Sequence, residues 1–247
     1  MAKQTGLGDN LYVSGYNLSG DVGSLSRIGG GATVIDVTGI DKSAHERLLG
    51  VRDGAIEFSA FFNAAAGQAH PVLSTLPRAD RMVSYFRGTA IGNPAATMLA
   101  KQINYDPTRA TDGALTLAVS AQANSFGIEW GEQLTAGQLQ HTGAAAGTSL
   151  DNGASTAFGL QAYLHVFSFT GTSCTVAIQE SSDDGAGDAW ANVTDGVFSA
   201  ASAVGSERIA TANNQTIEQY LRINTTGTFS ECTFAVVVVR NDTTVTF

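Results

Sequence analysis

The last third of the sequence contains one pattern twice, and this repeat constrains the fold more than any other feature. The first copy, within 161–178, reads QAYLHV, then TGT, then CTVAI, and the second, within 219–236, reads QYLRI, then TGT, then CTFAV. Each copy has an alternating strand, a Thr-Gly-Thr connection and a second strand rich in β-branched residues, which is typical of a β-hairpin. The repeat predicts a β-sandwich or jelly-roll domain that presents a surface rather than a reaction centre.

Composition divides the chain into four parts. Residues 1–32 are rich in Gly, Ser and Asn, so we expect either an arm that gains order from another subunit or a frayed terminus. Residues 33–135 are expected to form a mainly β domain, a sandwich or barrel with one or two short helices. Residues 136–158, which are mostly Gly, Ala, Ser and Thr, predict a flexible linker, and the all-β C-terminal domain then covers 159–247.

The 33–135 segment also predicts individual elements. Short helices are expected at 43–49, where Gly50 supplies the stop, and near 68–76. The segment 55–62 alternates as a strand does, with Glu57 and Ser59 on its polar face. Its apolar face carries Ile56, Phe58, Ala60 and Phe62.

The charge of the chain excludes one class of partner. The net charge is −9, and it is concentrated in residues 151–247, which carry −7, whereas residues 1–150 carry −2. An acidic surface with few lysines does not attract phosphate backbones. The sequence therefore excludes nucleic-acid binding by direct charge attraction.

Motifs for catalysis or cofactor binding are missing from the sequence. Gly-x-Ser-x-Gly, a phosphate-binding Lys loop and Gly-x-Gly-x-x-Gly do not occur. His45-Glu46 resembles the start of a zinc-protease helix, but Leu49 stands where the second histidine is needed. We therefore predict no catalytic, cofactor-binding or metal-binding residue, no cofactor, and no enzymatic activity.

The two cysteines and the hydropathy of the chain suggest where it is made. Cys174 and Cys232 occupy matching places in the two copies, and synthesis in the cytosol favours free thiols, although a disulfide between neighbouring strands stays open. The sequence contains no run of about 20 apolar residues and no apolar signal core near Met1, so we expect no membrane segment.

Three pieces of the first half, taken in order, carry a family resemblance. They are DVTGIDKSA at 36–44, LGVRDGAI at 49–56, and QINYDPTR at 102–109 running into DGAL at 112–115. Their order resembles that of the major tail tube proteins of long-tailed, siphovirus-type bacteriophages, particularly those of actinobacterial phages. The C-terminal repeat is similar to the extra domain that many such proteins carry.

This resemblance implies a structural virion protein assembled in the host cytoplasm. Its expected form is a hexameric ring whose hairpins complete a shared inner β-barrel, with rings stacked into the tail tube and the C-terminal domain outside. DNA would pass through during ejection without specific binding. The expected partners are further copies of the chain and other tail proteins: the tape measure, the tail terminator and the distal tail protein.

The resemblance also implies candidate interface residues. Glu57 and Ser59 are candidates for the face toward the lumen. The candidates for contacts between subunits or rings are Arg27, Asp41, Arg47, Arg52, Asp53 and Arg109. Arg81, Arg87 and Lys101 belong to the same expected sheet, and the bases are expected to pair within interfaces rather than line the channel.

One alternative function comes from the C-terminal repeat. The chain could be a capsid decoration or adhesion protein whose jelly-roll binds a host surface or carbohydrate. Trp190 is the aromatic residue that could stack on a sugar, and an edge position in the core is the alternative interpretation of that residue.

Overall fold

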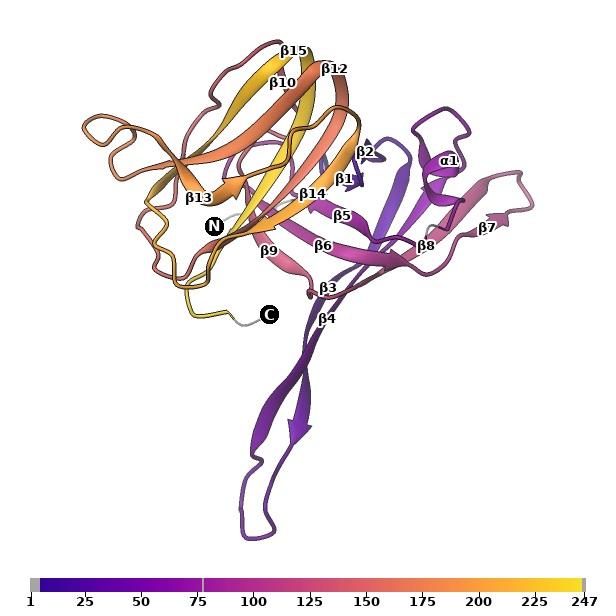
Figure 1. Cartoon of the computed structure of the whole chain (residues 1–247). Coiled ribbons are helices and arrows are strands. Elements are labelled where there is room, and N and C mark those ends of the chain that lie inside the picture. Colours follow the sequence, from indigo (N-terminus) through magenta and orange to yellow (C-terminus); the bar gives the residue numbers. More distant parts are fainter. Residues whose placement is uncertain (1–4, 77, 246–247) are drawn as a thin grey trace. The chain divides into compact units, whose positions relative to one another are not determined.

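The computed structural model describes residues 5–76 and 78–245. The described chain is almost entirely β: fifteen strands and one five-residue helix, α1 (Ala69–Leu73) (Figure 1). This confirms the mainly β fold class. Among the described residues, no helix is long and apolar enough to cross a membrane.

The chain forms two compact units that are discontinuous in sequence. The first unit takes the described residues within Met1–Gly20, Ser84–Thr97 and Trp130–Phe247, and the second takes Asp21–Val83 and Met98–Glu129. The division differs from the expected continuous domains at 33–135 and 159–247. It falls within three strands: β5 (Arg81–Phe86), β6 (Pro94–Gln102) and β9 (Glu129–Gln133).

Two long strands form the centre of the first unit. β12 (Leu160–Ser181) and β15 (Tyr220–Arg240) pair antiparallel along their whole lengths, as Figure 1 shows. The prediction that each sequence copy is a hairpin is therefore wrong, because each copy is one continuous strand that pairs with the other copy. The alternation of side chains does not say whether a Thr-Gly-Thr segment reverses the chain or only bends it.

Both Thr-Gly-Thr segments are bends in mid-strand. Gly171 and Gly227 have φ values of +151° and +119°, and the pairing register shifts on both sides of Gly171. A Cβ on Gly171 would lie 2.4 Å from the Cα of Phe229, and a Cβ on Gly227 would lie 2.3 Å from the carbonyl oxygen of Ser173. Glycine is therefore required at both bends, both for its backbone conformation and for the close approach of the two strands.

The bend lets one hydrophobic core form between the two halves of the β12–β15 ladder. A single buried cluster contains Leu164 and Val236 from one half, and Val176 and Ile223 from the other. The two halves thus act as the two layers of a sandwich. This agrees with the sandwich expected for the C-terminal part, although the connections differ from those expected.

Short strands extend the ladder. β13 (Ala191–Val197) and β14 (Gly205–Ala210) pair with β12. β9, β10 (Leu139–His141) and β11 (Leu150–Asp151) pair with β15. The segment 136–158 is therefore not a free linker, because two of its short stretches are hydrogen-bonded to the central strand.

The start of the chain belongs to the same unit. β1 (Asn10–Val13) and β2 (Tyr16–Asn17) form a small hairpin, and Leu11, Tyr12 and Val13 are buried. The ring of Tyr12 lies 4.7 Å from that of Phe86 and 4.8 Å from that of Phe167. This part of the expected 1–32 arm therefore packs on its own chain and does not need another subunit to become ordered.

The cysteines lie in the sandwich core. Cys174 and Cys232 are both buried free thiols. The hydrogen bond to Cys174, followed by burial, raises the pKa of the Cys232 thiol. The expectation of free thiols is confirmed.

The second unit is built around a long hairpin. β3 (Val22–Asp36) pairs with β4 (Arg47–Phe61), β4 pairs with β8 (Leu115–Ala123), and β8 also pairs with β6 and with β7 (Asp106–Arg109). The apolar face expected for 55–62 is buried at Ile56, Phe58 and Ala60, whereas Phe62, just past the end of β4, is exposed.

The two expected helices had different outcomes. Helix α1 confirms the one near 68–76; Pro71 lies in its first turn, and the Asp21 carboxylate accepts a hydrogen bond of 2.9 Å from the N–H of Ala69. The helix expected at 43–49 is wrong, because β4 already begins at Arg47 and Leu48 pairs with Ile35 across the hairpin.

Candidate assembly surface

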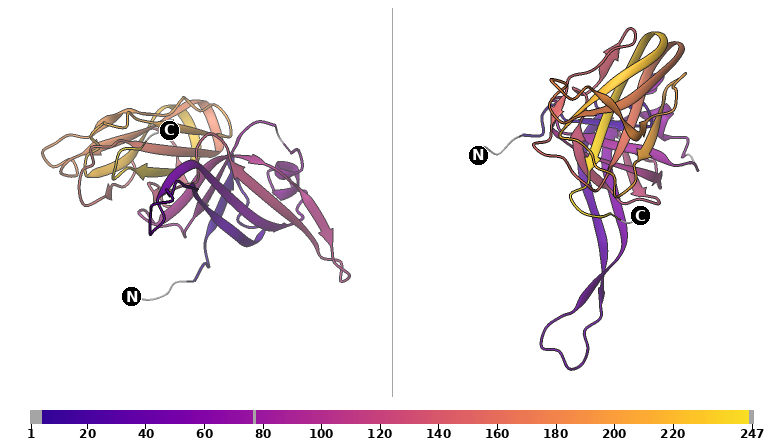
Figure 2. Two further views of the ribbon diagram at one scale, coloured as in Figure 1. Left: turned by 90° about the horizontal axis from the view of Figure 1, so that it is seen from below. Right: turned by 60° about the vertical axis from the view of Figure 1, so that its left-hand side comes forward.

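The outer part of the β3–β4 hairpin is a two-stranded ribbon. β4 pairs with β3 from Arg47 to Ala60, but with β8 only from Ala55 to Phe61. The ribbon beyond Ala55 projects past the other strands of the second unit (Figure 1 and Figure 2). The outer edge of β3 pairs with no other strand in the described parts of the chain. Unpaired backbone groups on such an edge can pair with another chain.

The ribbon exposes many large apolar side chains. Ile40 is fully exposed, and Leu49 and Val51 are 78% and 77% exposed. The full set on the ribbon and its tip is Val34, Ile35, Val37, Ile40, Leu48, Leu49 and Val51. Isolated two-stranded ribbons are marginally stable in water, and exposed apolar groups gathered on one element are typical of an interface.

The tip of the ribbon, 37–46, is held by its own polar groups. The Asp36 carboxylate lies 2.9 Å from Nδ1 of His45 and accepts a 2.9 Å hydrogen bond from the N–H of Thr38. The Thr38 hydroxyl oxygen accepts a 2.9 Å bond from the N–H of Glu46. The hydrogen bonds from Thr38, first from its hydroxyl and then from its N–H, lower the pKa of Asp36. The tip therefore has a defined shape before it meets any partner.

Most of the predicted interface residues lie on this hairpin. Asp41 is in the tip, and Arg47, Arg52 and Asp53 lie on the two-stranded part of β4. Arg27, nearer the base, is 3.6 Å from Glu57 across the ladder. Arg109 lies elsewhere, at the exposed end of β7. Charges of both signs thus alternate with apolar groups along one element.

The two lumen candidates lie on the polar face of the sheet. Glu57 and Ser59 point to the side opposite the buried Ile56 and Phe58. Ser59 Oγ lies 2.8 Å from Ser24 Oγ, and Glu57 is paired with Arg27. The charge of Glu57 is therefore partly balanced within the chain. That this face lines a lumen stays a prediction.

Bases outside the hairpin are paired within the chain. Arg87 lies 2.8 Å from Asp9, and Lys101 lies 2.7 Å from Asp80. Arg81 is half-buried at the start of β5. Pairing with acids of the same chain takes Arg87 and Lys101 out of the set of charges free for contacts between copies, contrary to their expected pairing within interfaces.

Sequence reasoning missed a buried Ser–His pair in the first unit. Ser84 Oγ lies 2.8 Å from Nε2 of His165 and 2.6 Å from Thr97 Oγ1, and all three side chains are fully buried. The N–H of Gly15 donates to Nδ1 of His165 at 3.1 Å. The four residues come from distant parts of the sequence, and no local motif connects them.

This pair does not form a nucleophile and base. Because Nδ1 accepts the bond from Gly15, the ring proton is assigned to Nε2, which donates to Ser84 and cannot take a proton from it. Burial lowers the pKa of His165 to about 3, so the ring is neutral. The arrangement is a structural link between separate segments of the first unit. No cluster of three or more His, Cys, Asp or Glu side chains in the described residues could hold a metal ion.

Trp190, the aromatic residue of the alternative function, is not free to stack. The Arg222 guanidinium lies 4.3 Å from the centre of its ring, and the residue is half-buried. Nearby, the backbone N–H groups of Gly187 and Asp188 donate to the Asp183 carboxylate, so that loop closes on itself. These contacts agree with an edge position in the core.

Comparison with known proteins found two weak structural similarities. A tail protein from an empty GTA particle, determined with C6 symmetry, is 15% identical, matches 51% of this chain and 97% of its own, and gives a TM-score of 0.39. The SPP1 Dit protein, described as a paradigm of the hub adsorption apparatus in phages that infect Gram-positive hosts, is 11% identical, matches 94% and 98%, and gives 0.34. No family model and no curated protein matches the chain.

Proposed function

We propose that this chain is a structural, non-enzymatic protein of a phage tail, and more specifically a tail tube subunit that assembles with copies of itself through the β3–β4 hairpin. The observation that supports it is the two-stranded ribbon with an unpaired edge and exposed apolar side chains. The two structural similarities, to a tail and to an adsorption hub, agree with this assignment without carrying it.

A second copy would satisfy both needs of the ribbon. Strand pairing along the outer edge of β3 supplies partners for its backbone N–H and C=O groups. Burial of Leu49, Val51 and their neighbours then contributes about 25 cal/mol for each Å² of apolar surface removed from water. Arg47, Arg52 and Asp53 supply charges of both signs, which can set the register between copies.

The finer features of the proposal come from the sequence resemblance. They are hexameric rings, stacking into a hollow tube for DNA ejection, location in the virion, and partnership with the tape measure, tail terminator and distal tail proteins. The −7 charge of residues 151–247 fits an exterior position, because like charges limit association between neighbouring polymers.

Electron microscopy and analytical ultracentrifugation of the purified chain test the proposal. The wild type is expected to form rings or tubes at high concentration. Leu49→Lys with Val51→Lys is expected to remain monomeric with an unchanged circular dichroism spectrum, because both side chains are exposed and the added charges oppose burial. Val204→Lys, at an exposed valine in the first unit, is the matched control and should assemble. Assembly of the double variant at the wild-type concentration contradicts the role of the ribbon.

The same images separate the proposal from the alternative. A capsid decoration or adhesion protein gives isolated oligomers that bind capsids or host surfaces and do not form tubes. Rings or tubes exclude that outcome as the main function.

A further inference from the structure

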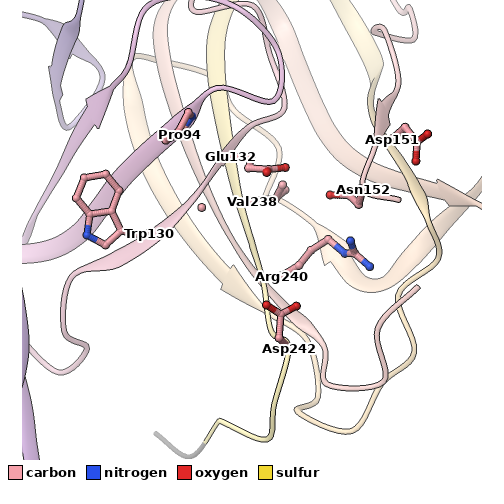
Figure 3. Close-up of a pocket in the computed structure, with 9 residues that line it drawn as sticks. Pro94, Trp130, Glu132, Asp151, Asn152, Val238, Arg240 and Asp242 are labelled. Carbon is pink, nitrogen blue, oxygen red and sulfur yellow. The ribbon is translucent and has the colours of Figure 1, made fainter. Parts of the chain in front are cut away.

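The first unit contains a polar cavity that plays no part in the assembly hairpin. Its volume is about 450 Å³, within the range of about 300–1,000 Å³ found for small-molecule sites. All of its lining residues belong to the first unit. Figure 3 shows Trp130 and Pro94 at one end, Asp151 and Asn152 at the other, and Glu132 between them.

A glycine shapes the floor of the cavity. Gly131 lies on β9 between Trp130 and Glu132, whose side chains are both exposed. A Cβ on Gly131 would lie 2.1 Å from the carbonyl oxygen of Val238 on β15. The close approach of β9 to β15 therefore needs glycine, and it places Trp130 and Glu132 on the same side of their strand.

The polar groups at the far end are fixed by bonds to the protein. The Asp151 carboxylate accepts bonds from the Gln219 amide at 2.8 Å and from the Gly153 N–H at 2.7 Å. These bonds lower its pKa, so it stays ionised at neutral pH. The Asn152 amide donates to the carbonyl of Gln219 at 2.8 Å. A ligand would meet polar atoms that are already oriented, which reduces the entropy cost of binding.

The charge of the cavity selects against anions. Glu132, Asp151 and Asp242 supply three carboxylates, and Arg240 supplies the one guanidinium among the lining residues. The Arg240 guanidinium donates to the carbonyl of Ala154 at 2.5 Å. Partial burial lowers the pKa of Arg240, while the charges of Asp242 and Glu132 act in the opposite direction. The net negative charge disfavours acidic ligands such as phosphates or sulfated sugars.

Trp130 supplies an apolar surface at the edge of this polar cavity. It is 52% exposed, and its ring contacts that of Tyr85 at 6.4 Å between centroids, with an interplanar angle of 74°. Large aromatic residues this exposed are unusual unless they bind something. Trp190, by contrast, is covered by Arg222.

We propose that this cavity binds a neutral saccharide. A sugar ring has apolar C–H faces that pack against an aromatic ring, and hydroxyl groups that both donate and accept hydrogen bonds. Trp130 matches the first property. The carboxylates of Glu132 and Asp151 accept from hydroxyls, and the Asn152 amide and the Arg240 guanidinium donate to them. Because the cavity lies apart from the β3–β4 ribbon in sequence and in unit, the inference does not depend on the proposed assembly.

Tryptophan fluorescence provides a direct test, since Trp130 and Trp190 are the two tryptophans of the chain. In a Trp190→Phe background, emission reports on Trp130 alone. We expect at least one of maltotriose, cellotriose and tri-N-acetylchitotriose to change this emission in a saturable way, and a sulfated heparin tetrasaccharide to have no effect. The full chain is used, and isothermal titration calorimetry on the wild type measures the affinity.

Variants identify the cavity as the site. Trp130→Ala should weaken binding at least tenfold, whereas Trp190→Phe should leave it unchanged. If Trp130→Ala does not fold, Glu132→Lys, at an exposed position, should cause a similar loss through its charge and bulk. Absence of binding by all three neutral sugars, preference for the sulfated sugar, or full binding by both Trp130→Ala and Glu132→Lys overturns the proposal. The Leu49→Lys, Val51→Lys chain should bind normally, so failure of assembly and failure of sugar binding are distinguishable.

Discussion

The backbone N–H of Gly15 donates a 3.1 Å hydrogen bond to Nδ1 of His165, 150 residues away in the sequence. The bond joins the turn of the β1–β2 hairpin to the first half of β12. A Cβ on Gly15 would lie 2.6 Å from the carbonyl oxygen of Val166, so a glycine is needed for this approach. Because the His165 ring is fully buried and neutral, it makes the stability of the first unit depend on pH.

We predict that acid destabilises the chain through His165. Burial lowers its pKa from 6.5 to about 3. Below pH 6.5 the unfolded chain binds a proton that the folded chain does not, so the free energy of unfolding falls by about 1.4 kcal/mol per pH unit down to about pH 3. Above pH 6.5 this residue causes no pH dependence.

His165→Gln isolates this effect, because glutamine can accept from Gly15 and donate to Ser84 but does not titrate. Urea unfolding of both proteins at pH 7, 5.5 and 4.5 gives the comparison. The stability advantage of the wild type should shrink as the pH falls, while carboxylates affect both proteins equally. A constant difference across this range contradicts the assignment.

We predict that the mid-strand bends tolerate only glycine. Gly171→Ala and Gly227→Ala each place a Cβ within 2.4 Å of the partner strand, at positive φ, so each should lower the free energy of unfolding by roughly 2–4 kcal/mol. Gly143→Ala is the control, because a Cβ there meets nothing within 4 Å. Chemical denaturation measures all three. Equal stability of the bend variants and the control would show that the bends are not strained by a side chain.

We predict slow labelling of both cysteines in the native state. Cys174 and Cys232 are fully buried, and the raised pKa of Cys232 makes its thiolate scarce at neutral pH. Mass spectrometry after iodoacetamide treatment should find neither residue modified without denaturant and both modified in 6 M guanidinium. Rapid labelling of the native chain would mean that the sandwich core opens readily.

We predict that Asp9 stabilises the first unit. Its carboxylate accepts hydrogen bonds from the Tyr85 hydroxyl at 2.5 Å and from Arg87 at 2.8 Å. Asp9→Ala leaves both donors partly buried without this acceptor and should cost roughly 2–4 kcal/mol in thermal or urea unfolding. Asp41→Ala, at the exposed tip, should change stability by less than about 0.5 kcal/mol. Similar losses for the two variants would contradict this role.

Local patterns predicted the elements that depend on near neighbours. The alternation at 55–62 correctly gave the buried face of Ile56, Phe58 and Ala60, because one strand determines which of its sides is apolar. The short helix near Pro71 was likewise found. The helix expected at 43–49 was wrong because the cross-strand pairs of Leu48 and the polar bonds of Thr38 override a short helical pattern.

Long-range pairing was not accessible in this way. The repeat marked both Thr-Gly-Thr segments, but the partner of β12 is decided by contacts made about 60 residues away along the chain, so two hairpins and one bent ladder have the same local pattern. The domain boundary failed for the same reason. Removing residues 151–247 would uncover Tyr12 and Phe86, which pack on Phe167, so that truncation is expected to aggregate rather than assemble.

The candidate sites were found only in part. Asp41, Arg47, Arg52 and Asp53 were placed on one hairpin by the family resemblance, whereas composition alone assigned them no role. The cavity beside Trp130 has no motif, because its walls come from β9, β15 and the 151–154 loop. Only the folded chain brings these segments together.

The bends at Gly171 and Gly227 also determine how the sandwich comes apart. Since β12 and β15 pass uninterrupted from one layer to the other, neither layer can lose its central strands while the other stays closed. Amide protons on both sides of the bends should therefore exchange with deuterium through the same global opening, so that the two sheets melt as one cooperative block.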